Sequence, residues 1–217
     1  MSGPEFVESL KAECERALSK LAPESAASAV VSPEQFADLL RAALKNEMEA
    51  AAVAAEWVAT TPPIEAKLAL ARHAGDEARH YELLADRIRM LGMDFSDFNP
   101  LEPPSPVLQF LRTLTAPEER IAAALVAREA MGHRRNLQFL ALLESAGRHD
   151  IAQIYRDVIN PDEERHHRAG CALLARMAAT PDTQKRARAA ALRLLETGDA
   201  AREAFIRKTG LPLVPGC

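Results

Sequence analysis

The pentapeptide Asp-Glu-x-Arg-His occurs twice in the chain, at residues 76–80 and 162–166. In each copy a glutamate precedes a histidine by three residues, and residues three apart lie on one face of an α-helix. A carboxylate and an imidazole that point the same way can bind a divalent metal ion together. The repeat therefore indicates metal chemistry. The candidate ligands are Glu77, His80, Glu163 and His166.

Both copies lie on stripes of apolar residues that have helical spacing. The first stripe includes Leu70 and Ile88, and the second includes Ile151 and Leu173. Such a stripe faces the interior of a protein, where an uncompensated charge is costly. The carboxylates and imidazoles are therefore predicted to lie inside a helical bundle, where cations must balance them.

Two further glutamates are predicted to lie at the same level on neighbouring helices. Counting from the turn between the first two long helices places Glu47 within about one turn of Glu77, because each residue advances a helix by about 1.5 Å. The same count in the second pair of helices brings Glu129 close to Glu163. Four carboxylates in one buried layer require about two divalent cations, and oxygen ligands with one imidazole each favour iron or manganese over structural zinc.

Prolines and capping residues delimit the helices that must position these side chains. Ser32, Pro33 and Gln35 form a helix start with a capping box. The proline-rich segment 93–116 is predicted to be a long connection with a short helical piece at about 107–114. The expected helices span about residues 4–21, 33–60, 63–92, 118–147, 150–179 and 181–208, and the segment after residue 210 is expected to be irregular.

The composition predicts an all-α protein, because alanine, leucine, glutamate and arginine dominate the periodic stretches. Residues 1–217 are expected to form one helical domain. Short loops make the helices of each pair antiparallel, so that the core at about 33–179 consists of two hairpins joined by a long crossover. One additional helix is expected on each side of this core.

Charge and cysteine usage exclude several classes of protein. The net charge of −4 provides no attraction to nucleic acid or to anionic membranes. No apolar run approaches the roughly 18 residues of a membrane span. Cys14, Cys171 and Cys217 have no pair spacing, so neither a disulfide framework nor a cysteine-based metal site is predicted. The start of the chain lacks the pattern of a signal peptide, and the cytoplasm is the expected compartment.

On these residues, the segment 33–179 resembles the ferritin-like di-iron carboxylate superfamily. The form Asp-Glu-x-Arg-His in both copies is similar to that of bacterial multicomponent monooxygenases. The resemblance implies a ferritin-like four-helix bundle that holds two iron ions, as Fe/Fe or as Mn/Fe. The implied ligands are Glu47, Glu77, His80, Glu129, Glu163 and His166.

The resemblance also implies a role for the residues that flank the ligands. Asp76 and Asp162 are expected to accept hydrogen bonds from the outer N–H groups of the metal-bound histidines, across the two-fold pseudo-repeat. Arg79 and Arg165 are expected to pair with these aspartates.

By the same resemblance the chain is expected to be an oxygen-activating oxidase or monooxygenase, such as a hydroxylase. Its expected partners are O2, a small-molecule or carrier-bound substrate, and an electron-donor protein or other reductant. Nucleic acid is not expected, although a tRNA-modifying hydroxylase is left open, and a homodimer is one compatible oligomeric state.

A rubrerythrin-like peroxidase and a ferritin-like ferroxidase or iron-storage protein are the alternatives. The lack of a cysteine-rich site argues against the first, and the additional terminal helices argue against the second. A metal-free interaction bundle, with the pentapeptides on a salt-bridged surface, leaves the apolar stripes unexplained.

Three points are left open by the pattern. Glu164 and His167 have the same spacing as Glu163 and His166, but the apolar stripe favours the latter pair. The helix is expected to be kinked at Pro161, although a restart there is the alternative. His73 and His133 each lie one helical turn from a candidate ligand and could approach the metal site or pack as ordinary core residues.

Overall fold

The computed structural model describes residues 1–20, 31–211 and 213–216. Leu21, Pro212 and Cys217, which the sequence predictions included, lie outside the described residues. The described part of the chain is all-α and contains no strand. Within it, no helix is both long and apolar enough to cross a bilayer.

The helical elements follow the predicted order, with ends within about two residues of the expected positions. The α-helices are α1 (Gly3–Lys20), α2 (Pro33–Thr60), α3 (Ile64–Met90), α4 (Pro106–Thr113), α5 (Pro117–Arg120), α6 (Glu129–Ser145), α7 (His149–Ile154), α8 (Asn160–Met177) and α9 (Pro181–Thr209). Two π-helical segments are η2 (Ile121–Arg128) and η3 (Tyr155–Ile159).

Local sequence accounts for where several helices begin. The predicted capping box at Ser32 is confirmed: its hydroxyl accepts from the backbone N–H of Gln35, and the Gln35 side chain accepts from the backbone N–H of Ser32. Ser105 caps α4 in a similar way, with Pro106 in the first turn. Thr180 caps α9.

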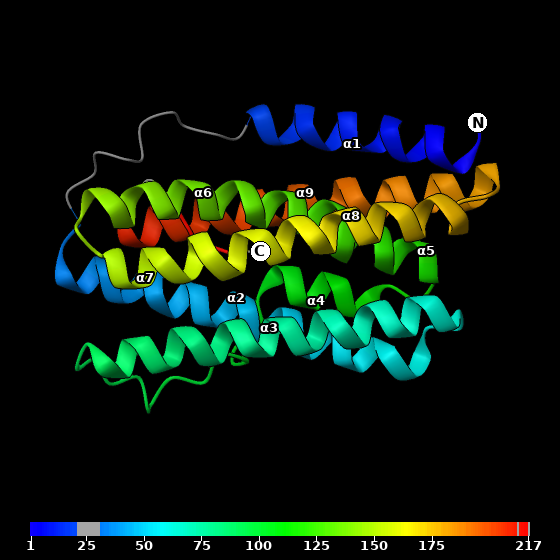
Figure 1. Ribbon diagram of the computed structural model, residues 1–217. Coiled ribbons are helices and arrows are strands. Elements are labelled where there is room, and N and C mark those ends of the chain that lie inside the picture. The colour runs from blue at the N-terminus through cyan, green and yellow to red at the C-terminus, as the bar shows by residue number, and fades with distance from the viewer. Residues whose placement is uncertain (21–30, 212, 217) are drawn as a thin grey trace.

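The long helices run side by side, and a short turn joins α2 to α3. Helix α4 belongs to the connection that leads from α3 to the second set of helices, and it lies between the two sets (Figure 1). Helix α1 lies along α8 and α9 on the far side of the molecule from α2 and α3 (Figure 1). Segment η2 packs against both α8 and α9, so it lies among the helices on the side of α1.

One π-helical segment, η3, lies directly before Pro161, where the sequence predicted a kink or a restart of the helix. Helix α7, η3 and α8 follow one another without interruption, and the backbone at Ile159 and Asn160 keeps right-handed helical angles. The backbone N–H of Asn160 donates to the carbonyl of Tyr155, five residues back, which is the wide turn of a π-helix. The helix therefore does not restart at the proline, which lacks an N–H group to donate.

Two apolar clusters lie along the helices, one on each side of the predicted polar layer. On α2, for example, Leu40 belongs to one cluster and Trp57 to the other, and Glu47 lies between them. The order is reversed on α3, where Leu70 precedes and Leu84 follows the first pentapeptide. The four helices that carry the pentapeptides and their partner glutamates thus bring their polar residues to one level.

The segment after α9 is irregular, as predicted, but it is also buried. Gly210 ends α9 in the left-handed conformation with φ 72°. Leu211 and Leu213 then pack in the core. Asn46 donates to the carbonyl of Pro215 at 2.7 Å, and the backbone N–H of Gly216 donates to Asn136 Oδ1 at 2.7 Å.

Candidate metal centre

The six predicted ligands all have buried side chains, the most exposed being His166 at 6 %. Their positions follow from the helices: α2 supplies one glutamate, α3 and α8 each supply a glutamate and a histidine, and α6 begins at the fourth glutamate, directly after η2. The residues are Glu47, Glu77, His80, Glu129, Glu163 and His166.

Two groups of these side chains could each hold a metal ion. The possible ligand atoms of each group lie within 4.8 Å of one another, and all the residues are buried. The first group consists of Glu47, Glu77 and His80, and the second consists of His73, Glu77, Glu129 and His166. Glu77 belongs to both groups.

The two oxygens of Glu77 face different histidines. His80 Nδ1 lies 3.4 Å from Glu77 Oε2 and 3.3 Å from Glu47 Oε2. His166 Nδ1 lies 3.2 Å from Glu77 Oε1 and 3.3 Å from Glu129 Oε2. The centroids of the two imidazole rings are 6.4 Å apart. Glu77 therefore lies between the two groups with one oxygen directed to each.

His73, whose role the sequence left undecided, is a member of the second group. Its Nε2 lies 2.9 Å from Glu129 Oε1 and 3.2 Å from Glu77 Oε1, and the residue is buried. The signal in the sequence is its position one turn before Glu77 on the same helical face. His133, the other undecided histidine, belongs to neither group among the described residues.

Glu163 lies in the same buried layer but outside both groups. Its Oε1 accepts a hydrogen bond of 2.7 Å from Asn136 Nδ2. Asn136 also contacts Gly216, so one buried amide connects the end of the described chain with a predicted ligand. The sequence analysis did not identify Asn136, because an isolated asparagine on a helix has no distinctive spacing.

The structure distinguishes the two possible registers of the second pentapeptide. Glu164 is exposed and lies 2.9 Å from Arg168, its ion-pair partner. His167 Nδ1 lies 3.0 Å from the carbonyl of Val126 in η2. Glu163 and His166 are buried, whereas Glu164 is exposed and His167 contacts the backbone of η2.

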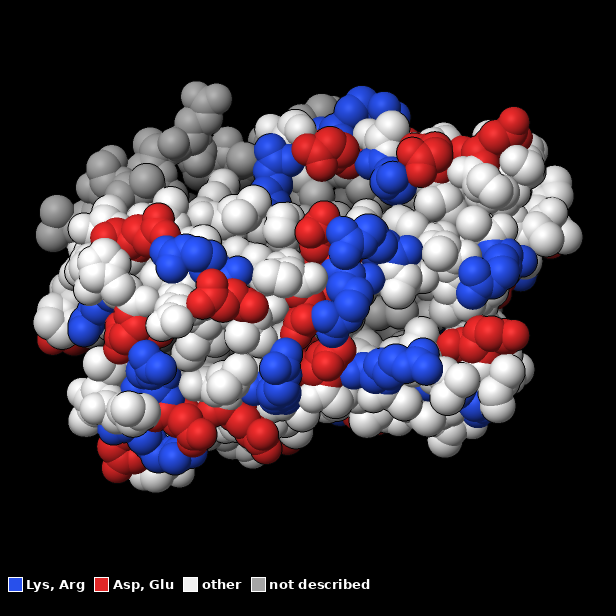
Figure 2. Space-filling view, viewed as in Figure 1, with Lys and Arg blue, Asp and Glu red and all other residues white. Residues whose placement is uncertain are grey.

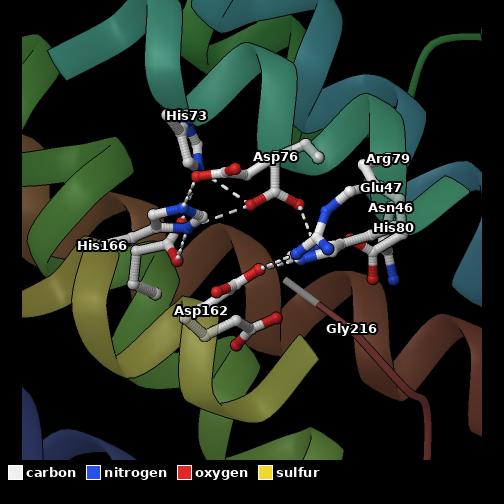
Figure 3. A network of polar contacts seen from close by, with 12 residues as sticks. Asn46, Glu47, His73, Asp76, Arg79, His80, Asp162, His166 and Gly216 are labelled. Atoms are coloured by element: carbon white, nitrogen blue, oxygen red, sulfur yellow. Dashed lines mark hydrogen bonds and ion pairs between the residues drawn. The ribbon is translucent and has the colours of Figure 1, made fainter. Parts of the chain in front are cut away.

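The outer nitrogens of the two histidines contact aspartates of the opposite pentapeptide (Figure 3). His80 Nε2 lies 3.0 Å from Asp162 Oδ2, and His166 Nε2 lies 2.9 Å from Asp76 Oδ2. An aspartate that accepts from the outer N–H fixes the ring and leaves the inner nitrogen free to bind a metal.

Two arginines surround these aspartates. Arg79 donates to Asp162 at 2.6 Å, while Arg165 donates to Asp76 at 2.8 Å and also contacts Asp162. The two negative and two positive charges of this outer network balance one another.

Protons provide the positive charge at the centre when no metal is bound. Burial disfavours the charged imidazole of His80, but its contacts with Glu47 and Glu77 outweigh burial and raise its pKa to about 12. The same balance, with Glu129 and Glu77, raises the pKa of His166 to about 11. These histidines are therefore protonated at neutral pH in the metal-free protein.

The carboxylates respond to the same environment in opposite ways. Burial raises the pKa of Glu47 to about 8. Burial also opposes the ionisation of Glu77, but its contacts with three histidines outweigh burial and hold its pKa well below the usual range. The central carboxylate is thus charged, and the outer one of the first group is neutral at pH 7.

The donor set fits two divalent cations. Each group combines carboxylate oxygens with imidazole nitrogen, the ligands that iron and manganese accept. Glu47 Oε1 and both oxygens of Glu77 are buried without a hydrogen bond of good geometry. Buried polar atoms normally have partners, and a cation in each group would supply them.

Comparisons with protein-family models, with curated proteins and with solved structures gave no match.

Proposed function

We propose that the chain is a member of the ferritin-like di-iron carboxylate superfamily and is an O2-dependent oxidoreductase of the oxidase or monooxygenase type. The observation that carries this proposal is that one buried carboxylate, Glu77, is shared by two groups of potential ligands. Glu77 would thus be a ligand of both ions, which would hold them in one buried site.

The proposed ligands of one ion are Glu47, Glu77 and His80, and those of the other are His73, Glu77, Glu129 and His166. Glu163 stays a predicted ligand on the basis of the pentapeptide, although it contacts Asn136 in the structure and belongs to neither group. When bound, a pair of iron ions would supply the reductive activation of O2.

The protein's own residues would orient the ligands and exclude water. Asp162 and Asp76 hold the outer nitrogens of His80 and His166, which fixes the direction of the inner nitrogens. The apolar clusters on both sides of the layer would limit the access of water to the centre, which would strengthen the electrostatic interactions inside it. The electrons would come from an external reductant.

Iron stoichiometry and O2 consumption together test the proposal. Anaerobic titration with Fe(II) is expected to saturate at about two ions per chain, and the reduced protein is expected to consume O2. The Glu77→Gln variant should lose both properties, because it removes the shared ligand. Uptake of many ions per chain would instead indicate storage, and a failure to bind iron would exclude both functions.

A further inference from the structure

A cavity of about 400 Å³ lies beside the second ligand group, between α3 and α8. Its volume is in the usual range for small-molecule sites. His73 and His166 line its inner side, and both belong to that group. A molecule in this cavity would lie directly against the proposed metal centre.

The remaining wall combines apolar and charged side chains. Ala69, Leu125 and Ala169 provide the apolar part. Figure 2 shows Lys and Arg side chains gathered near the middle of this face, where α3 and α8 run next to each other. The charged residues that line the cavity are Arg72, Asp76 and Arg165.

The charges of Asp76 and Arg165 are compensated, but that of Arg72 is not. Arg165 donates to Asp76 at 2.8 Å, and both belong to the balanced outer network around the histidines. Within the described part of the chain, Arg72 is exposed and has no carboxylate within ion-pair distance. A guanidinium at a cavity wall with no counter-ion can form a charge-assisted, bidentate contact with a carboxylate ligand.

We propose that this cavity binds the substrate, and that the substrate is an organic acid with an apolar body. Its carboxylate would contact Arg72, and its body would lie against Ala69, Leu125 and Ala169. The end of the molecule opposite the carboxylate would then approach His73 and His166. The inference rests on the proposed function for the reaction, but the binding of the acid is independent of it.

Isothermal titration calorimetry with 2-naphthoate tests the inference, with 2-naphthamide as the uncharged ligand of nearly the same shape. The purified protein is expected to bind the acid about tenfold more tightly than the amide, because only the acid forms a charge-assisted contact. The Arg72→Gln variant should lose this preference and bind the amide as before. Arg168→Gln is the matched control, since it removes a nearby exposed charge that does not line the cavity.

A second variant tests the location. Ala169→Phe should fill the cavity and weaken naphthoate binding about tenfold without changing the iron content. The inference is overturned if naphthoate does not bind at millimolar concentration, if Arg72→Gln keeps the preference for the acid, or if Ala169→Phe binds as tightly as the unaltered protein. If the protein binds two iron ions but gives any of these results, the inference is wrong and the proposed function still stands. If it binds naphthoate as expected but does not bind iron, the proposed function is wrong and the inference still stands.

Discussion

Three histidines surround Glu77. Its Oε1 lies 3.2 Å from a nitrogen of His73 and 3.2 Å from a nitrogen of His166, and its Oε2 lies 3.4 Å from a nitrogen of His80. A carboxylate this deeply buried is stable only with positive charge beside it. Protons on the imidazoles supply that charge in the metal-free protein, and metal ions would replace them. Because Glu77 belongs to both groups, a change at this residue affects both of them.

We expect the glutamates of the centre to differ in how many metal ions they retain. Glu47 belongs to one group and Glu77 to both, so Glu47→Gln should leave about one ion per chain and Glu77→Gln none. Metal analysis after Mn(II) titration measures this. Glu49→Gln is the control, because Glu49 is buried on the same helix but contacts Lys45 and Ser105 instead. Equal losses in Glu47→Gln and Glu77→Gln would contradict the sharing.

Metal affinity should rise with pH. The raised pKa values of His80 and His166, about 12 and 11, mean that both imidazoles are protonated at neutral pH and must lose that proton to bind a metal. Affinity for Zn(II) is therefore expected to increase about tenfold per pH unit for each proton released between pH 6 and 8. Proton release can be followed with an indicator in weak buffer. Binding that is independent of pH would show that the ligands are already deprotonated.

The sequence left the role of His73 undecided, and it predicted Glu163 as a ligand without its contact to Asn136. His73 has the correct helical spacing, but a packed histidine has the same spacing, so only the contacts with Glu129 and Glu77 decide its position. Glu163 was predicted from the repeat, whereas its contact with Asn136 depends on a rotamer that no pattern encodes. The crossed contacts of Asp76 and Asp162 lie where the resemblance implied, and their role toward a metal stays a prediction.

Among the helices, the close approach of α8 to η2 is the feature that spacing alone could not reveal. A Cβ atom at Gly170 would lie 2.5 Å from the Cβ and the carbonyl oxygen of Leu125. The glycine therefore allows the two helices to pack almost backbone to backbone. Helix ends were predictable because caps and prolines are local signals, but π-helical segments such as η2 arise from packing and leave no comparable signal.

Two glycine substitutions should have opposite effects on stability. Gly170→Ala forces α8 away from η2 and is expected to lower the free energy of unfolding by about 1–3 kcal/mol. Gly75→Ala, in the middle of α3 with no atom within 4 Å of the added Cβ, should raise it by about 0.5–1 kcal/mol. Urea denaturation of the two variants measures both effects. A neutral or stabilising Gly170→Ala would mean that the interface can relax.

At the scale of the whole molecule, a polar layer separates two apolar clusters. Without metal ions or protons, the negatively charged carboxylates of this layer would repel one another. The layer is therefore stable only when metal ions or protons balance these charges. The all-α class followed directly from composition and periodicity. The burial of the segment after α9 did not, because its leucines and prolines are too few to show a period.

Removal of metal should lower the thermal stability of the protein. A ligand present at about 100 times its dissociation constant stabilises the folded state by roughly 2.7 kcal/mol. In a chain of this size we expect the melting temperature to fall by roughly 5–10 °C after chelation. Calorimetry of samples whose metal content has been measured tests this. An unchanged melting temperature after complete removal would exclude a metal site in the polar layer.

The crossed contacts between His80 and Asp162 and between His166 and Asp76 have a consequence for any attempt to divide the chain. If the backbone were cut in the connection between α3 and α4, each fragment would retain a histidine whose aspartate had gone with the other. Neither fragment could then orient its own imidazole, and each would have to recruit its complement to do so. We therefore expect the two fragments to form the layer only as a complex, as the subunits of an obligate heterodimer do.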